Sequence, residues 1–101
     1  MKNVVVIVNS SVVQAVTDLL RESAVTAFTV TPVEGHGLRA GDDDSQSIRD
    51  RVVGFVPEVR IDIILPDAEV ASLIESLSRP DAGLAGHGTF WVLPIEQRGR
   101  F

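Results

Sequence analysis

The sequence contains no cysteine, so the chain has no disulfide, no thiolate metal site and no thiol nucleophile. It has only two histidines, and aromatic residues make up just 5% of its 101 residues.

Positive charge is also scarce. Nine lysines and arginines stand against fourteen aspartates and glutamates, which gives a net charge of −5 at pH 7. No basic cluster is present to contact a phosphate backbone, so we expect no nucleic-acid partner. The apolar run "VVVIV" at residues 4–8 is too short to cross a bilayer and lacks the features of a signal peptide. We expect a cytoplasmic protein without direct membrane insertion.

Apolar residues are plentiful, at 45% of the sequence, which excludes a disordered chain. The length suits one hydrophobic core, so we expect a single domain over residues 1–101. A domain of this size buries only about two thirds of its unfolded surface, and association with further copies would stabilise it.

The first half of the chain predicts strand, helix and strand. The β-branched run at residues 3–9 is typical of a strand at the centre of a sheet. Ser11 and Gln14 form a potential capping box for a helix over residues 12–22, which carries one apolar stripe. The threonine-rich run 26–35 predicts a second strand, and its Pro32 suits an edge strand or a bulge.

The second half repeats this order. Residues 56–65 alternate apolar and charged side chains at the period of a half-buried strand. Asp67 is a potential N-cap for a following helix with an apolar stripe that ends near Arg79. Residues 89–95 are rich in aromatic and β-branched side chains and predict the last strand.

The element order is that of an α+β, ferredoxin-like βαββαβ sandwich, with two helices on one face of an antiparallel sheet. The other face needs a cover, because exposed apolar side chains on a sheet promote aggregation. We expect other copies of the chain to bury it, with Trp91 in the core or in that interface.

Both histidines lie in the tripeptide Gly-His-Gly, His36 after the second predicted strand and His87 before the last. Glycines allow positive φ and close approach to a ligand, and successive N–H groups in such turns bind anions. Three hypotheses for these segments remain open: turns without a ligand, a phosphate site, or a metal site that joins His36 and His87. Residues 36–52 form a long polar loop, whose run Asp42–Asp44 we interpret as a solvated tip. No catalytic constellation is recognisable, so we expect no enzyme.

Three stretches resemble PII signalling proteins in order and spacing: "FTVTPVEGHG", "VVGFVPEVRIDIILPD" and "GLAGHGTFWV". The resemblance implies a homotrimer with three protruding T-loops, here about residues 36–52, and adenine nucleotides bound in clefts between subunits. Carried over by position, the cleft residues are Thr29, Gly35, His36, Gly37, Leu38, Arg39 and Ile64 of one subunit, and Gly86, His87, Gly88 and Thr89 of its neighbour, with Arg100 as a further contact.

The chain departs from the nitrogen-sensing members at several of these positions. They have lysine at the positions of Glu58 and Thr89, glutamine at that of Arg39, and a modifiable tyrosine in the loop, whereas this chain has no tyrosine. A carboxylate at position 58 would repel an oxoacid, so we predict no 2-oxoglutarate sensing. With fewer cations in the cleft, we expect AMP or ADP as the ligand rather than ATP.

The C-terminal "LPIEQRGRF" is similar to a small PII-like branch encoded beside heavy-metal efflux pumps. The resemblance implies a regulator that contacts a target protein through its T-loop. Membrane transporters are one class of such targets. The alternatives are a metal-binding accessory of an efflux system, a relative associated with bicarbonate transport or carboxysomes, and a trimeric adaptor without a small ligand.

Overall fold

The computed structural model describes residues 1–23, 25, 27–36 and 55–101. Within these residues the chain forms four strands, two α-helices and two short 3-10 helices. In chain order they are β1 (Lys2–Asn9), η1 (Ser10–Val12), α1 (Val13–Glu22), β2 (Phe28–Gly35), β3 (Val56–Leu65), α4 (Asp67–Ser78), η2 (Pro80–Ala82) and β4 (Gly88–Pro94).

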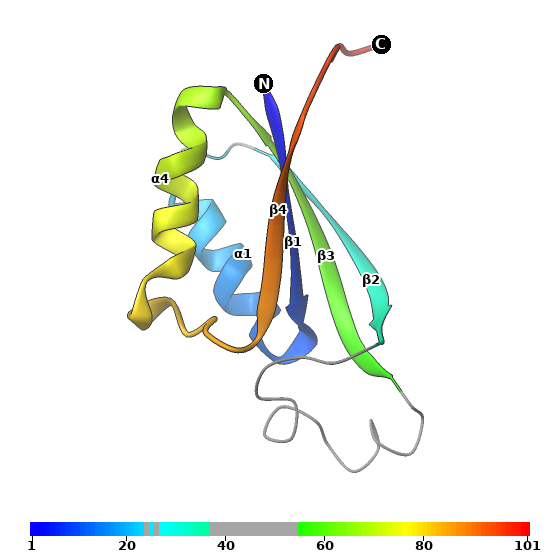
Figure 1. Ribbon diagram of the computed structural model, residues 1–101, viewed down its shortest axis with the longest axis vertical. Coiled ribbons are helices and arrows are strands. Elements are labelled where there is room, and N and C mark those ends of the chain that lie inside the picture. The colour runs from blue at the N-terminus through cyan, green and yellow to red at the C-terminus, as the bar shows by residue number, and fades with distance from the viewer. Residues whose placement is uncertain (24, 26, 37–54) are drawn as a thin grey trace.

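The four strands form one sheet in the order β2-β3-β1-β4, and all neighbouring strands are antiparallel. Figure 1 shows α1 and α4 together on one side of this sheet. The predicted α+β, ferredoxin-like βαββαβ arrangement is therefore confirmed. β1 lies inside the sheet, as its continuous apolar run predicted, and β2 lies at an edge, where the missing N–H of Pro32 is tolerated.

The core lies between the helices and one face of the sheet. Alternate residues of the two inner strands, β1 and β3, meet the apolar stripes of both helices. The buried side chains of this cluster are Val4, Val6, Val8, Val16, Leu20, Ile61, Ile63, Leu65, Leu73 and Leu77. Neither α-helix in the part of the chain described above is long and apolar enough to span a bilayer.

The opposite face of the sheet is only partly buried in the single chain. Val5 has no exposed surface, but its cross-strand partner Trp91 is 39% exposed. Ile64 and Leu93, both opposite Asn3, are 40% and 43% exposed. Trp91 therefore does not lie in the helix-covered core. Its burial in an interface with other copies stays a prediction.

Both predicted helix caps are wrong in detail. The turn after β1 is capped by Asn9, whose side-chain oxygen accepts a hydrogen bond of 3.0 Å from the Ser11 backbone N–H. Gln14 instead donates to Asp18 within the helix, at 2.8 Å, so the Ser11–Gln14 capping box does not form. The chain enters α1 through a 3-10 turn one residue after β1, which leaves Asn9 as the residue in the capping position.

Asp67 is the first residue of α4 rather than its N-cap, which is Pro66. Its carboxylate contacts the N-terminal amine of Met1 at 2.7 Å and the Lys2 ammonium at 3.7 Å. The hydrogen bond from the N-terminal amine lowers the pKa of Asp67. The residue therefore joins the start of β1 to the start of α4.

Candidate functional site

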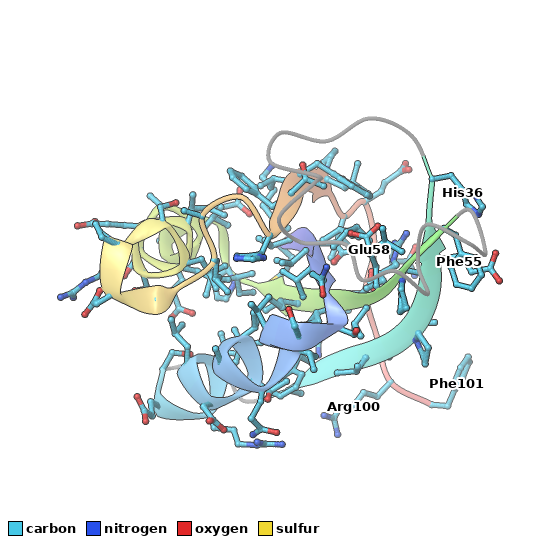
Figure 2. All side chains as sticks on the ribbon, turned by 90° about the horizontal axis from the view of Figure 1, so that it is seen from below. His36, Phe55, Glu58, Arg100 and Phe101 are labelled. Atoms are coloured by element: carbon cyan, nitrogen blue, oxygen red, sulfur yellow. The ribbon has the colours of Figure 1, made fainter. Side chains whose placement is uncertain are left out.

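The first Gly-His-Gly segment stands at the end of an edge strand. Gly35 ends β2 and His36 follows it, whereas Gly37, Leu38 and Arg39 lie outside the described residues, as does the rest of the predicted T-loop before Phe55. His36 Nε2 lies 3.3 Å from Glu34 Oε2. The His36 ring centroid is 6.0 Å from that of Phe55, the residue before β3, and Figure 2 shows these two side chains next to each other.

The second Gly-His-Gly segment closes a tight turn before β4. The His87 N–H donates to the Leu84 carbonyl at 2.9 Å, and Gly86 has φ of +78°. Positive φ at the third residue of a four-residue turn is the requirement of a type II turn, where glycine is favoured. Gly86 is therefore needed to form the turn itself.

Gly88 is needed for a different reason, because β4 approaches β1 closely at this point. A Cβ atom on Gly88 would lie 2.6 Å from the Ile7 carbonyl oxygen and 2.7 Å from Val8 Cγ1. The neighbouring His87 carbonyl accepts a hydrogen bond of 2.8 Å from the Asn9 N–H. Both glycines of this segment thus have roles in folding, in addition to the ligand contact expected from the sequence.

The ring of His87 carries an unpaired polar atom. Its Nδ1 is buried and, among the residues that the structure describes, has no hydrogen-bond partner. A buried polar atom without a partner costs free energy, so a group that donates to it would be stabilising. Beside the same turn lies a hollow of about 290 Å³, lined mainly by apolar side chains of β1, the end of α4 and β4, with backbone of Gly86 and Gly88.

The two segments lie at the same end of the sheet but at opposite edges. Gly35 pairs with Val56 at the start of β3, while Gly88 pairs with Val8 near the end of β1. Since β2 and β4 are three strand spacings apart, the two segments are separated by about 14 Å across the sheet. One chain therefore does not bring His36 and His87 together.

The other residues expected in the cleft lie farther along the sheet. Thr29 is opposite Asp62, and Ile64 is opposite Asn3. Arg100 is exposed and follows β4 at the end where both termini lie, away from the end of β2 (Figure 1). A ligand that contacted all of these positions would have to bind more than one copy of the chain.

The uncovered sheet face carries a polar cluster that sequence reasoning did not identify. Arg60 donates two hydrogen bonds of 3.0 Å to the Asp62 carboxylate, and Asn3 donates a third at 3.3 Å. The bonds from Arg60 lower the pKa of Asp62, and Asn3 adds to this effect. The alternation of charged residues along β3 was the available signal, because it places Glu58, Arg60 and Asp62 on one face. Glu58 is 8% exposed, opposite Asn9 and Val33.

A metal site within one chain finds no support in the described part of the structure. Nowhere in residues 1–23, 25, 27–36 and 55–101 do three or more histidine, aspartate or glutamate side chains converge. Glu34 and His36 form a pair only.

The fold and the two Gly-His-Gly segments define a ferredoxin-like α+β protein with one such segment at each edge of the same end of its sheet. The family described as nitrogen regulatory protein P-II matches residues 1–101. The chain therefore belongs to the P-II family of nitrogen regulatory proteins, a family of regulatory proteins rather than enzymes.

Among curated relatives, the nitrogen regulatory protein P-II of Azospirillum brasilense is 29% identical over 96% of this chain and 88% of its own length. Nitrogen regulatory protein P-II of Mesorhizobium japonicum is 30% identical over the same shares of both chains. Nitrogen regulatory protein P-II 1 of Escherichia coli K12 is 29% identical over 94% and 86%. These likenesses support a regulatory signalling role.

Among solved structures, a DUF3240 family protein from Shewanella baltica superposes with a TM-score of 0.75. The superposition covers 99% of this chain and 94% of that one, at 18% identity, and concerns the fold alone.

Members of the P-II family are trimers that bind target proteins, and the family binds adenine nucleotides.

Proposed function

We propose that this protein is a non-enzymatic cytoplasmic regulator that binds AMP or ADP in clefts between the subunits of a trimer. Occupancy of the cleft controls contact between a target protein and the loop at residues 36–52. Ligand binding supplies free energy that favours one conformation of such a loop, and this couples nucleotide level to the partner. A membrane transporter is the class of target that we favour.

The position of the two Gly-His-Gly segments supports this proposal most directly. Each copy of the chain carries one segment at the β2 edge and the other at the β4 edge, at the same end of the sheet. A closed ring of copies uses heterologous contacts, in which one surface of each copy meets a different surface of the next. Contacts between β2 and β4 edges in a trimer would then unite the segments in three equivalent clefts.

The side chains around these segments favour a ligand with few phosphates. The exposed Gly86 allows a ligand to approach the turn closely, and Thr89 supplies an exposed hydroxyl in place of an ammonium group. Glu58, on the sheet face that other copies would cover, adds negative charge where 2-oxoglutarate would need a cation. The proposal therefore includes no response to 2-oxoglutarate.

A thermal-shift series with AMP, ADP and ATP tests the proposal. Ligands that bind only the folded protein stabilise it by an amount that grows with the logarithm of ligand concentration over Kd, so at equal concentrations AMP or ADP should raise the Tm of the full chain more than ATP does. The Thr89→Lys variant should shift this preference toward ATP, because it adds a cation beside the turn. Gln97→Lys adds the same charge in the exposed C-terminal segment and should leave the preference unchanged. Absence of stabilisation by all three nucleotides would overturn the proposal.

A further inference from the structure

Glu34 and His36 present two metal-ligating atoms to each other at the end of β2. The Glu34 Oε2 and His36 Nε2 atoms are 3.3 Å apart, and both side chains are exposed, at 64% and 62%. Zinc binds histidine nitrogen and carboxylate oxygen at about 2.0–2.2 Å, so two ligands of a tetrahedral zinc ion are about 3.4 Å apart. The pair therefore already has the separation of one edge of a tetrahedral site.

The orientation of the His36 ring is restrained on two sides. Glu34 contacts Nε2, and the Phe55 ring lies 6.0 Å away between centroids at an interplanar angle of 38°. Because the contact comes from the residue before β3, it connects the end of β2 to the start of the next strand. A ligand ring that is held in place loses less conformational entropy when a metal binds.

One chain supplies too few ligands for a strong site. In the part of the chain that the structure describes, no third histidine, aspartate or glutamate joins Glu34 and His36. His87 is the other histidine of the sequence, and its side chain is only partly buried. Its Nδ1 is enclosed within its own chain, so Nε2 is the ring nitrogen that could reach a cation. His87 lies at the same end of the sheet but about three strand spacings from β2, or about 14 Å, so the same chain cannot supply it.

We infer that Glu34 and His36 of one copy, together with His87 of the next copy in the ring, form a binding site for a zinc- or copper-class cation. In a ring that sets the β2 edge of each copy against the β4 edge of its neighbour, each junction contains all three side chains. A site with two nitrogens, one oxygen and one open position suits a borderline cation such as Zn²⁺ or Cu²⁺ and not Mg²⁺ or Ca²⁺. The trimer then holds one cation for each chain. The inference does not depend on nucleotide binding.

Isothermal titration of the metal-free full chain with zinc chloride, without nucleotide, tests the site. The wild type should bind one zinc ion per chain, whereas magnesium chloride should give no binding heat. His36→Ala and His87→Ala should each weaken zinc binding by about tenfold or more, and Glu34→Gln should also weaken it. Glu96→Gln removes an exposed carboxylate beyond β4 and should leave the affinity unchanged.

Copper provides a readout that separates ligation from effects on folding or assembly. In electron paramagnetic resonance of the Cu²⁺ complex, the wild type should show coupling to two imidazole nitrogens. His87→Ala should show one nitrogen, with the trimer mass retained in light scattering. Zinc affinity that is the same in the wild type, His36→Ala and His87→Ala would overturn the inference, as would a copper signal without nitrogen coupling.

Discussion

Gly86 and Gly88, on either side of His87, are required for different reasons. Gly88 leaves no space for a side chain, whereas Gly86 has a positive φ. A Cβ at Gly88 would meet backbone and side-chain atoms of β1 within 2.7 Å, whereas one at Gly86 would enter open space but at a φ of +78°. A side chain that clashes with backbone atoms can be accommodated only if the backbone shifts, which costs about 1–3 kcal/mol. An alanine in the left-handed backbone conformation costs about 1–2 kcal/mol.

We therefore predict a graded series of stabilities. Gly88→Ala should lower the free energy of unfolding by about 1–3 kcal/mol and Gly86→Ala by about 1–2 kcal/mol. Gly99→Ala, where a Cβ meets nothing within 4 Å, is the control and should change it little. Urea unfolding of the three variants at one protein concentration measures the series. A Gly88→Ala variant as stable as Gly99→Ala would contradict the close contact of β4 with β1.

The Arg60–Asp62 pair gives a prediction about pH. Hydrogen bonds from Arg60 lower the pKa of Asp62 in the folded chain, so the pair stabilises the fold above the carboxyl's unfolded pKa of about 3.9. This contribution is lost as the pH falls through the lowered folded pKa. Asp62→Asn should reduce stability at pH 7 by at most about 1 kcal/mol, as for other partly exposed ion pairs, and the difference should shrink as the pH falls below about 3.9.

The matched control for this prediction is Asp81→Asn, which removes an exposed carboxylate 3.3 Å from the Arg79 guanidinium. Because both side chains of that pair are about two thirds exposed or more, its removal should have little effect at either pH. An Asp62→Asn effect that persists unchanged at pH 2.5 would show that the carboxylate charge is not its source.

At the scale of elements, the capping residue before α1 differs from the one expected: the sequence predicted Ser11, and the structure has Asn9. Asn9 caps the 3-10 turn through a bond of 3.0 Å to the Ser11 N–H, and Ser11 itself is exposed. Asn9→Ala should therefore destabilise the protein by about 1 kcal/mol, and Ser11→Ala by less than about 0.5 kcal/mol. Chemical unfolding of both variants measures the difference, and the reverse order would support the capping box instead.

The elements themselves could be predicted from the sequence because their periodicity was strong. β3 spans the predicted residues 56–65, and each of the other strands lies within two residues of its expected start. The caps could not be predicted, since Asn9 and Asp67 become available for their roles only once β1 and α4 are placed. The contacts of Gly88 with Ile7 and of Asn3 with Asp62 join residues about 60 or more apart in sequence, which no local pattern shows.

The candidate site was predictable to a smaller extent. Both Gly-His-Gly segments fall at element ends as expected, but the Glu34–His36 contact depends on side-chain orientation after β2 ends. The separation of the two segments at opposite edges follows from the strand order β2-β3-β1-β4, which element order alone does not fix. Ligand contacts at residues 37–39 stay predictions.

At the scale of the whole molecule, the partly exposed sheet face gives a prediction about assembly. Trp91, Leu93 and Ile64 would leave apolar surface in water if the chain were a monomer. Light scattering should give three times the chain mass of 10.9 kDa for the wild type. Trp91→Glu should lower that mass, because it places a charge in the interface, whereas Phe101→Glu at the fully exposed C-terminus should not. A trimer that tolerates Trp91→Glu would show that this face is covered in another way.

The proposal that the protein binds ADP in preference to ATP, without a response to 2-oxoglutarate, is tested most directly by calorimetric titration of the wild-type trimer with ADP and with ATP. The ATP titrations are run with magnesium, in the presence and absence of 2-oxoglutarate. We predict ADP binding at up to three sites per trimer, weaker binding of ATP, and no change in ATP affinity when 2-oxoglutarate is added. Sub-micromolar ATP binding that 2-oxoglutarate strengthens, or no heat with either nucleotide, would contradict the proposed function.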